Sequence, residues 1–226
     1  MREAERMGDT LLPLYGQEFR AFKIDWGPFG RTTAKPDAAI VAAARKAIEP
    51  DAFLMIDAGA SDTFWPQGYK RALNTAEMLA DYNVTWFEPL HPDALDDYVA
   101  LKRAAKVSIA GGEVLTRRQS FQLLLDRGAF DIVQPDMTKV GGLSEQRRFV
   151  WMAQKRGTRF IPHGWNTAVG LASDLQIASA FPDTDMVEYL TGSPFIDELA
   201  SGGWHLDSEG MLPIPTAPAL WRGNQL

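Results

Sequence analysis

The chain has 226 residues, 46% of them hydrophobic, which is enough for one large domain with a sizeable core. Its formal net charge of −6 argues against nucleic acid or an anionic membrane as the main partner, and no apolar stretch reaches the ~20 residues of a membrane helix. The absence of cysteine excludes disulfides, thiolate metal sites and cysteine nucleophiles, and it fits a reducing compartment such as the cytoplasm.

Short apolar runs rich in β-forming residues recur along the chain, and each ends in a polar or charged residue. In chain order they read RAFKIDW, AFLMIDAG, TWFEP, VSIAGGE, FDIVQPD, RFIPHG and DMVEYL, and LLPLY at residues 11–15 is a candidate for an earlier strand. The stretches between them have helical spacing, with apolar side chains on one face in three sets: Tyr69, Leu73, Ala76 and Leu79; Phe121, Leu124 and Leu125; Phe149 and Met152. Strand followed by helix, many times over, predicts a parallel sheet that closes into a (β/α) barrel.

The polar residues that end these runs are candidates for an active site. They lie about 23 to 31 residues apart, close to the ~30 residues of one βα unit in a barrel, so they are expected at the carboxyl ends of successive strands. That face of the barrel carries active sites. The alternative, that each residue simply begins a polar loop, explains one or two of them but not six in phase: Asp57, Glu88, Glu113, Asp136, His163 and Glu188.

Asp57, Glu88 and Glu113 end three consecutive strands. Three carboxylates that converge without a counter-charge repel one another, and a bound dication resolves the repulsion. Oxygen ligands suit a hard ion, with Mg²⁺ as the default. We therefore expect a divalent metal site, with room on the ion for substrate oxygens.

Asp136 and His163 end the next two strands and are expected to be neighbours. A carboxylate beside an imidazole fixes its tautomer and raises its pKa, which makes a general acid/base pair. The alternative is a core histidine, but Pro162 and Gly164 break the strand at the rim and favour the functional interpretation. Lys23, near the end of an earlier strand, is a candidate base or carboxylate-binding cation. A metal that holds a carboxylate between such groups stabilises the enediolate formed by loss of the neighbouring proton.

The motifs FKIDWGPFG, LMIDAG, WFEP, IAGGE, QPDMTKVGG, IPHGWN and VEYL, in this order over roughly residues 11 to 190, resemble the mandelate racemase/muconate lactonizing enzyme family of the enolase superfamily. The resemblance implies a modified TIM barrel, (β/α)7β-like, preceded by an α+β capping domain. It implies that Asp57, Glu88 and Glu113 are Mg²⁺ ligands and that Asp136 and His163 form the dyad of the mandelate racemase subgroup. It also matches Glu188 to the residue that hydrogen-bonds the substrate carboxylate or the enediolate, and Lys23 to the first Lys of a K-x-K motif.

Two local departures from the family pattern bear on the reaction. The K-x-K motif reads Lys23-Ile24-Asp25, so the base on the second face of the substrate is missing and a two-base racemisation is not expected. The usual Glu-Glu-Pro reads Glu88-Pro89, one acid short. An elimination needs only the dyad, so the sequence favours acid-sugar dehydration.

The expected domain organisation also departs from the family pattern, because we find no counterpart of the capping domain in these 226 residues. Residues 1–10 are expected to be a remnant or linker from it, residues 11–190 the barrel, and residues 191–226 an irregular segment that packs on the barrel. The interval from Tyr15 to Lys23 is too short for a barrel helix, which predicts either a truncated form or missing internal segments.

The sequence thus predicts a Mg²⁺-dependent hydro-lyase that converts an aldonate or aldarate into a 2-keto-3-deoxy acid. His163, Asp136, Lys23 and Glu188 are the expected catalytic residues; Asp25, Trp165 and Asn166 are expected to contact the substrate. A racemase or epimerase of a 2-hydroxy or amino acid, and a non-catalytic barrel, remain as alternatives. The expected partners are a small carboxylate substrate and further copies of the chain in a homo-oligomer.

Overall fold

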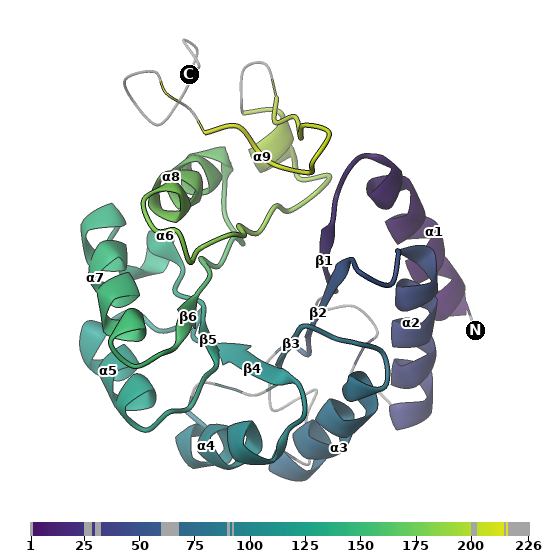
Figure 1. Ribbon diagram of the computed structural model, residues 1–226, viewed down its shortest axis with the longest axis horizontal. Coiled ribbons are helices and arrows are strands. Elements are labelled where there is room, and N and C mark those ends of the chain that lie inside the picture. The colour runs from purple at the N-terminus through teal and green to yellow at the C-terminus, as the bar shows by residue number, and fades with distance from the viewer. Residues whose placement is uncertain are drawn as a thin grey trace. The chain divides into compact units, whose positions relative to one another are not determined.

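The computed structural model describes residues 2–24, 29, 33–59, 68–89, 91, 93–199, 203–214 and 216. Along the described chain, each strand is followed by one or two helices (Figure 1). The chain divides into two compact units, Met1–Ala110 with Ser208–Gly210 and Gly111–Asp207 with Met211–Leu226, and each is described by itself.

In the part of the chain that the structure describes, the strands form a six-stranded sheet in chain order, and the pairs described are parallel. They are β1 (Ala21–Ile24), β2 (Phe53–Asp57), β3 (Trp86–Glu88), β4 (Ser108–Gly111), β5 (Ile132–Val133) and β6 (Arg159–Phe160). Six of the seven runs that end in a polar residue therefore contain a strand, which confirms the predicted parallel α/β architecture and the TIM-barrel-like class.

The register of the first unit places its charged residues on one face. Lys23 pairs with Met55, and Asp57 pairs with Glu88. Paired residues of neighbouring strands point to the same side, as do residues two apart along one strand. Lys23, Asp57 and Glu88 consequently lie on the same face of the sheet.

Four helices belong to the described residues of the first unit: α1 (Arg2–Gly16), α2 (Ala34–Ala47), α3 (Gly68–Ala80) and α4 (Leu95–Ala104). Helix α1 packs along α2 (Figure 1), while α3 packs on both α2 and α4. The predicted face of α3 is only partly confirmed, because Ala76 and Leu79 are buried whereas Leu73 is half-buried. An ion pair of 2.5 Å between Arg71 and buried Asp37 joins α3 to α2.

The prediction of a strand at residues 11–15 is wrong, because these residues form the end of α1. Met7, Leu11 and Leu14 recur at helical spacing, and Leu11 is buried. Five apolar residues in a row fit a helix end as well as a strand, and the polar helical residues before them decide the outcome. Because α1 itself precedes β1, the short interval from Tyr15 to Lys23 implies no missing helix.

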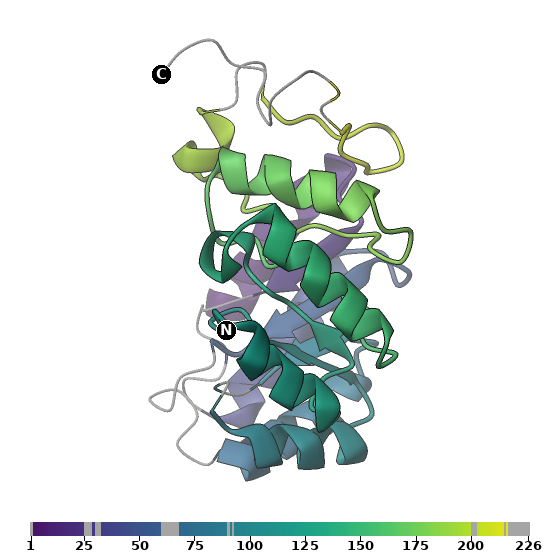
Figure 2. The same ribbon diagram turned by 90° about the vertical axis from the view of Figure 1, so that its left-hand side faces the viewer.

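The second unit contains five helices among the described residues: α5 (Arg118–Asp126), α6 (Met137–Val140), α7 (Leu143–Gln154), α8 (Ala168–Ser179) and α9 (Pro194–Asp197). Helix α7 packs between α5 and α8 (Figure 2). The predicted apolar faces of α5 and α7 meet through Phe121 and Phe149, whose ring centroids are 4.4 Å apart. Helix α8 is buried over most of its circumference.

The run at residues 185–190 forms no strand, contrary to the prediction. Val187 and Tyr189 pack against the cluster of Leu171, Leu175 and Ile196, while Glu188 between them points the other way. The segment thus alternates as a strand does, but its contacts are made by side chains rather than by a ladder of backbone hydrogen bonds. The predicted domain boundaries at residues 10/11 and 190/191 stay predictions.

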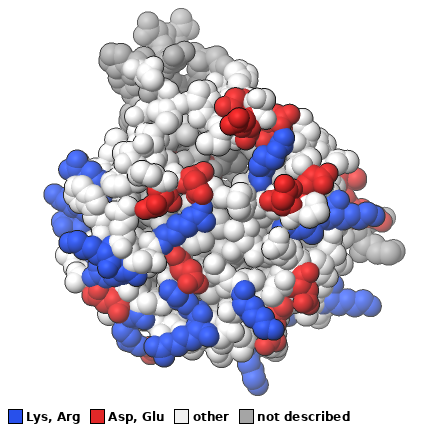
Figure 3. Space-filling model, in the orientation of Figure 1, with Lys and Arg blue, Asp and Glu red and all other residues white. Residues whose placement is uncertain are grey.

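The visible surface carries acidic and basic side chains interspersed, without a large patch of one sign (Figure 3). Within the described part of the chain, no helix combines the length and the apolar character needed to cross a bilayer.

Arg45 of α2 braces the connections that lead into β2 and β3. Its guanidinium donates to the backbone carbonyls of Tyr82 at 3.0 Å, Asn83 at 2.9 Å, Glu49 at 3.1 Å and Ala52 at 2.8 Å. Only a planar group with several N–H donors can serve carbonyls from both connections at once.

We predict that Arg45→Lys lowers the free energy of unfolding by about 1–3 kcal/mol, because one ammonium cannot satisfy four carbonyls. Urea denaturation followed by circular dichroism measures this loss. The exposed neighbour Lys46 provides the control, since Lys46→Ala should change stability by less than ~0.5 kcal/mol. Equal effects of the two substitutions would contradict the bracing role.

Candidate active site

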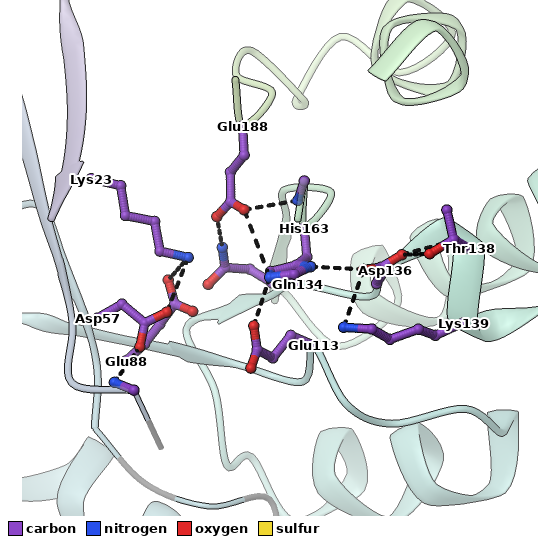
Figure 4. Close-up of polar contacts among 12 residues, drawn as sticks. Lys23, Asp57, Glu88, Glu113, Gln134, Asp136, Thr138, Lys139, His163 and Glu188 are labelled. Carbon is purple, nitrogen blue, oxygen red and sulfur yellow. Dashed lines mark hydrogen bonds and ion pairs between the residues drawn. The ribbon is translucent and has the colours of Figure 1, made fainter. Parts of the chain in front are cut away.

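The first unit gathers two carboxylates around one ammonium at the carboxyl ends of its strands. Lys23 Nζ lies 2.8 Å from Glu88 Oε1 and 3.4 Å from Asp57 Oδ2 (Figure 4). Trp86 Nε1 donates to Glu88 Oε1 at 3.0 Å, and the backbone N–H of Gly59 donates to Asp57 Oδ1 at 2.7 Å. All three charged side chains are largely buried, so the ammonium balances carboxylates that have little water around them.

The second unit holds a histidine between two carboxylates. Asp136 and His163 form a parallel bridge that continues the register of β5 and β6. The bridge brings His163 Nδ1 to 2.9 Å from Asp136 Oδ2, while Nε2 lies 2.6 Å from Glu113 Oε2 (Figure 4). The predicted Asp136–His163 neighbourhood is therefore present, and the imidazole is buried.

Contacts with neighbouring residues in the sequence hold the Asp136 side chain in place beside the histidine. Asp136 is the N-cap of α6, and its Oδ1 accepts hydrogen bonds from Thr138 N at 2.8 Å and Thr138 Oγ1 at 2.6 Å. Lys139 Nζ lies 3.2 Å from Oδ2. One carboxylate oxygen is thus held by its own helix, which leaves the other for the imidazole and the lysine.

The pKa values of the dyad follow from this arrangement. Burial alone would raise the pKa of Asp136, but hydrogen bonds from His163 and Thr138 and the charge of Lys139 lower it to about 2. Burial alone would lower the pKa of His163, yet hydrogen bonds with Asp136 and Glu113 and the charges of Glu188 and Glu113 raise it to about 10. In this arrangement the imidazole is protonated and paired with carboxylates at both nitrogens.

Glu188 is oriented by two donors from the second unit. Gln134 Nε2 donates to Oε1 at 2.9 Å, and the backbone N–H of Gly164 donates to Oε2 at 2.8 Å. Oε2 also lies 4.0 Å from His163 Nε2. Position 164 has to be glycine for this approach, because a Cβ there would lie 2.5 Å from the backbone oxygen of Glu188.

The predicted metal ligands fall into both units. Asp57 and Glu88 share the Lys23 ammonium in the first unit, and Glu113 faces His163 in the second. No group of three or more His, Cys, Asp or Glu side chains among the described residues is arranged to hold a metal ion. The donor chemistry nevertheless fits a hard cation, because buried carboxylate oxygens already hold one positive charge between Asp57 and Glu88.

The three predicted substrate contacts have different surroundings. Trp165 directly follows the dyad histidine and is 53% exposed, so it is open to a ligand. The amide atoms of Asn166 are buried instead. Asp25 lies outside the described residues.

Sequence reasoning missed two buried polar residues of the second unit. Gln134 stands two residues before Asp136 on the same strand end, and this i, i+2 spacing is a signal that both point the same way. Asp174 is the single charged residue of the otherwise apolar helix α8, and it is only 1% exposed. A lone acid in such a helix is a sequence signal for a buried titratable group.

Comparison with known proteins places this geometry in a family. The model of the family described as "Enolase C-terminal domain-like" matches residues 3–220. D-galactarolactone cycloisomerase from Agrobacterium fabrum is 37% identical over 169 residues, which cover 73% of this chain and 42% of that protein. The chain therefore spans less than half the length of this curated relative.

Solved structures agree with the fold. The 3,6-anhydro-D-galactonate cycloisomerase from Zobellia galactanivorans superposes with a TM-score of 0.83 at 29% identity, over 96% of this chain and 60% of that chain. A predicted mandelate racemase from Rhodobacter sphaeroides gives 0.83 at 31% identity, over 96% and 56%. A mutant L-talarate/galactarate dehydratase liganded with Mg and L-glucarate gives 0.81 at 22% identity, over 94% and 50%, and shares the fold.

We predict that Gly164→Ala lowers the free energy of unfolding by about 1–3 kcal/mol, because the new methyl group displaces the backbone at Glu188. Thermal unfolding of the two proteins measures the difference. Gly16→Ala is the matched control, since no atom lies within 4 Å of a Cβ at that position. A Gly164→Ala protein as stable as the control would show that the two segments do not approach this closely.

Proposed function

Because the chain belongs to the enolase C-terminal domain-like family of the enolase superfamily, we propose that it is the catalytic barrel of an acid-sugar dehydratase. The enzyme would remove the proton beside the carboxylate of an aldonate or aldarate, eliminate water and give a 2-keto-3-deoxy acid. The observation that carries the proposal is the buried His163 imidazole, held 2.9 Å from Asp136 at the end of its strand.

The acid-sugar class of the substrate is supported by the names of two relatives. The Agrobacterium protein acts on a galactarolactone and the Zobellia protein on an anhydrogalactonate, and both substrates are acids derived from sugars. The likeness to a predicted mandelate racemase keeps a racemase as an alternative. Between these classes we favour the acid sugar, because the relative of highest sequence identity reported above is a sugar-acid enzyme.

In the proposed mechanism His163 takes the proton through Nε2. Asp136 accepts the hydrogen of Nδ1, which fixes the tautomer and leaves Nε2 for the substrate. In the present structure the imidazole is protonated and Glu113 faces Nε2. Before His163 can act as a base, Glu113 has to turn away and Nε2 has to release its proton to solvent, which leaves a free lone pair for the substrate proton. The protonated His163 then returns its proton to the departing hydroxyl group, which leaves as water.

Asp57, Glu88 and Glu113 are the proposed holders of a divalent cation, with Mg²⁺ as the expected ion. The cation, when bound, supplies positive charge that offsets the charge developing on the substrate carboxylate. Glu113 would turn its oxygens away from His163 when it acts as a ligand, which frees Nε2. A Mg²⁺ ion accompanies the ligand in one solved protein of this fold.

Glu188 and Lys23 are the remaining catalytic residues in the proposal. The donors Gln134 and Gly164 orient Glu188, so that its carboxylate can hydrogen-bond the substrate or the enediolate. Lys23 is the proposed cation for the substrate carboxylate. On the loop after His163, the half-exposed Trp165 is the proposed sugar contact, and Asp25 is proposed as another.

A cycloisomerase is the second candidate, and the names of two relatives favour it. The same proton abstraction would then expel a ring oxygen instead of a hydroxyl group, and no water would leave. Mass spectrometry separates the two reactions, because a dehydrated product is lighter than its substrate by one water and a cycloisomerised product is not.

We predict that the protein converts at least one member of an acid-sugar library, lactones included, and that His163→Asn lowers kcat on that compound by at least ~10³-fold. Asparagine keeps the approximate size of the side chain but cannot exchange the proton. Formation of 2-keto acid and exchange of the α-proton in D₂O measure the effect.

His205→Asn serves as the control for this substitution, because His205 is exposed and lies outside the site. Turnover that survives in His163→Asn would exclude the dyad mechanism. Exchange of the α-proton without elimination would favour a racemase, and the absence of both reactions on every compound would favour a barrel without catalysis.

We also predict that Mg²⁺ raises the melting temperature and that a chelator reverses the rise, because an ion that binds only the folded state stabilises it by about 2.7 kcal/mol at a concentration of ~100 Kd. Glu88→Gln removes a charged ligand and should abolish the Mg²⁺ effect. The same substitution at exposed Glu49 should retain it. An unchanged response in Glu88→Gln would remove this residue from the metal site.

A further inference from the structure

Helix α8 buries a carboxyl group that the proposed mechanism does not use. Asp174 is 1% exposed, and neither of its carboxyl oxygens has a hydrogen-bonding partner among the described residues. A buried carboxylate without partners is costly, and such a group usually becomes neutral by taking up a proton. The protonation state of Asp174 therefore affects the stability of the second unit.

One polar group that acts on Asp174 is the amide of Asn166, three residues after the dyad histidine. Asn166 lies close enough to act on the Asp174 carboxyl, but neither of its amide atoms makes a hydrogen bond of normal geometry with a described residue. The amide occupies the space above Gly170, where a Cβ would lie 2.1 Å from Asn166 Oδ1. Asn166, Gly170 and Asp174 thus form a stripe with four-residue spacing, and the missing side chain of Gly170 makes room for the amide.

The charged groups that act on Asp174 belong to the dyad and its surroundings. Asp136, at the start of α6, and Glu188 both carry negative charge toward it, while His163 acts in the opposite direction. Lys139 lies on the same α6 helix but pairs with Asp136. An ionised Asp174 would be a third negative charge among these groups, with two carboxylates opposing it and one imidazole favouring it.

We propose that Asp174 is a positioning residue that stays protonated and, together with Asn166, fixes the turn between His163 and α8. The proton keeps a further negative charge away from the dyad, and the Asn166 amide anchors the turn on Gly170. The inference rests on the proposed function only in what it implies for catalysis, since the state of Asp174 exists without substrate.

The shift in the pKa of Asp174 agrees with its buried position without hydrogen-bonding partners in the described part of the chain. Burial, followed by the charge of Asp136, raises the pKa of Asp174 from 3.8 to about 8. Asn166 and His163 lower it, and the charge of Glu188 adds a smaller rise. Between these pKa values the unfolded chain has lost the proton and the folded chain keeps it. The contribution of Asp174 to stability therefore falls as the pH rises from about 4 to about 8, and it is constant above that.

Infrared spectroscopy of the whole chain tests the protonation state. The difference spectrum of wild type minus Asp174→Asn, at about pH 7, should contain the C=O band of a protonated carboxylic acid, and the band should disappear with an apparent pKa near 8. The melting temperature of Asp174→Asn relative to wild type should rise from about pH 4 to about pH 8. Asp183→Asn, at an exposed position, should show neither effect.

Absence of the acid band, together with a pH dependence of melting that is the same in wild type and Asp174→Asn, would overturn the proposal. Should Asp174→Asn fail to fold, Asp174→Ser takes its place as a smaller neutral residue. If both fail, the pH dependence of hydrogen exchange and of the carboxyl band in the wild-type protein still decides whether a buried acid loses its proton near pH 8.

Gly170→Ala tests the position of the Asn166 amide. The methyl group should displace the amide and lower the melting temperature, and the double variant Asn166→Ala/Gly170→Ala should recover part of that loss because the amide is gone. Gly8→Ala, in the interior of α1 where a Cβ would make an ordinary 3.8 Å contact, is the matched control. If Gly170→Ala changed the melting temperature no more than Gly8→Ala does, the placement of the Asn166 amide above Gly170 would be contradicted.

The consequence for catalysis is a change in the pH profile. Above about pH 8 the ionised Asp174 should slow α-proton exchange, so the ratio of the rate at about pH 9 to the rate at about pH 7 should rise roughly tenfold in Asp174→Asn, in kcat rather than in KM. An unchanged ratio would remove the link to the dyad. If the dyad mechanism is wrong, His163→Asn will retain turnover. The infrared and melting experiments on Asp174 do not depend on that result, because they measure its protonation state without substrate.

Discussion

Carboxylates buried at the ends of parallel strands need a positive charge or a set of donors, and this constraint organises both units of the protein. In the first unit the Lys23 ammonium lies between Asp57 and Glu88. In the second unit the imidazole of His163 stands between Asp136 and Glu113. Each cluster is compensated from within its own unit, so the fold can carry the charges before any ligand arrives.

The position of these residues could be predicted because the period of a parallel α/β fold is long and regular. One polar residue ends each strand, and the register of β1, β2 and β3 then aligns Lys23, Asp57 and Glu88 on one face. The pairing of Asp136 with His163 follows in the same way from the register of β5 and β6. Short-range sequence rules sufficed here, since the backbone geometry leaves little choice of side.

Where prediction failed, tertiary contacts decided between alternatives that look the same in sequence. Residues 11–15 are apolar enough for a strand, but they continue an amphipathic helix that packs on α2. Residues 185–190 alternate as a strand does, but side-chain packing on α8 and α9 takes the place of a ladder. Asp174 can be singled out in the sequence as the lone acid of an apolar helix, but its lack of hydrogen-bonding partners among the described residues depends on neighbours from distant parts of the chain, which periodicity does not reveal.

Asp136 has two tasks that a single substitution does not separate: it caps α6 with one oxygen and faces His163 with the other. An alanine scan would therefore merge loss of local folding with loss of acid/base chemistry and would overstate the latter. Asparagine, an equally good helix cap that lacks the charge, divides the two contributions. A substitution at position 136 therefore reports on the acid/base chemistry alone only when the new side chain still caps α6.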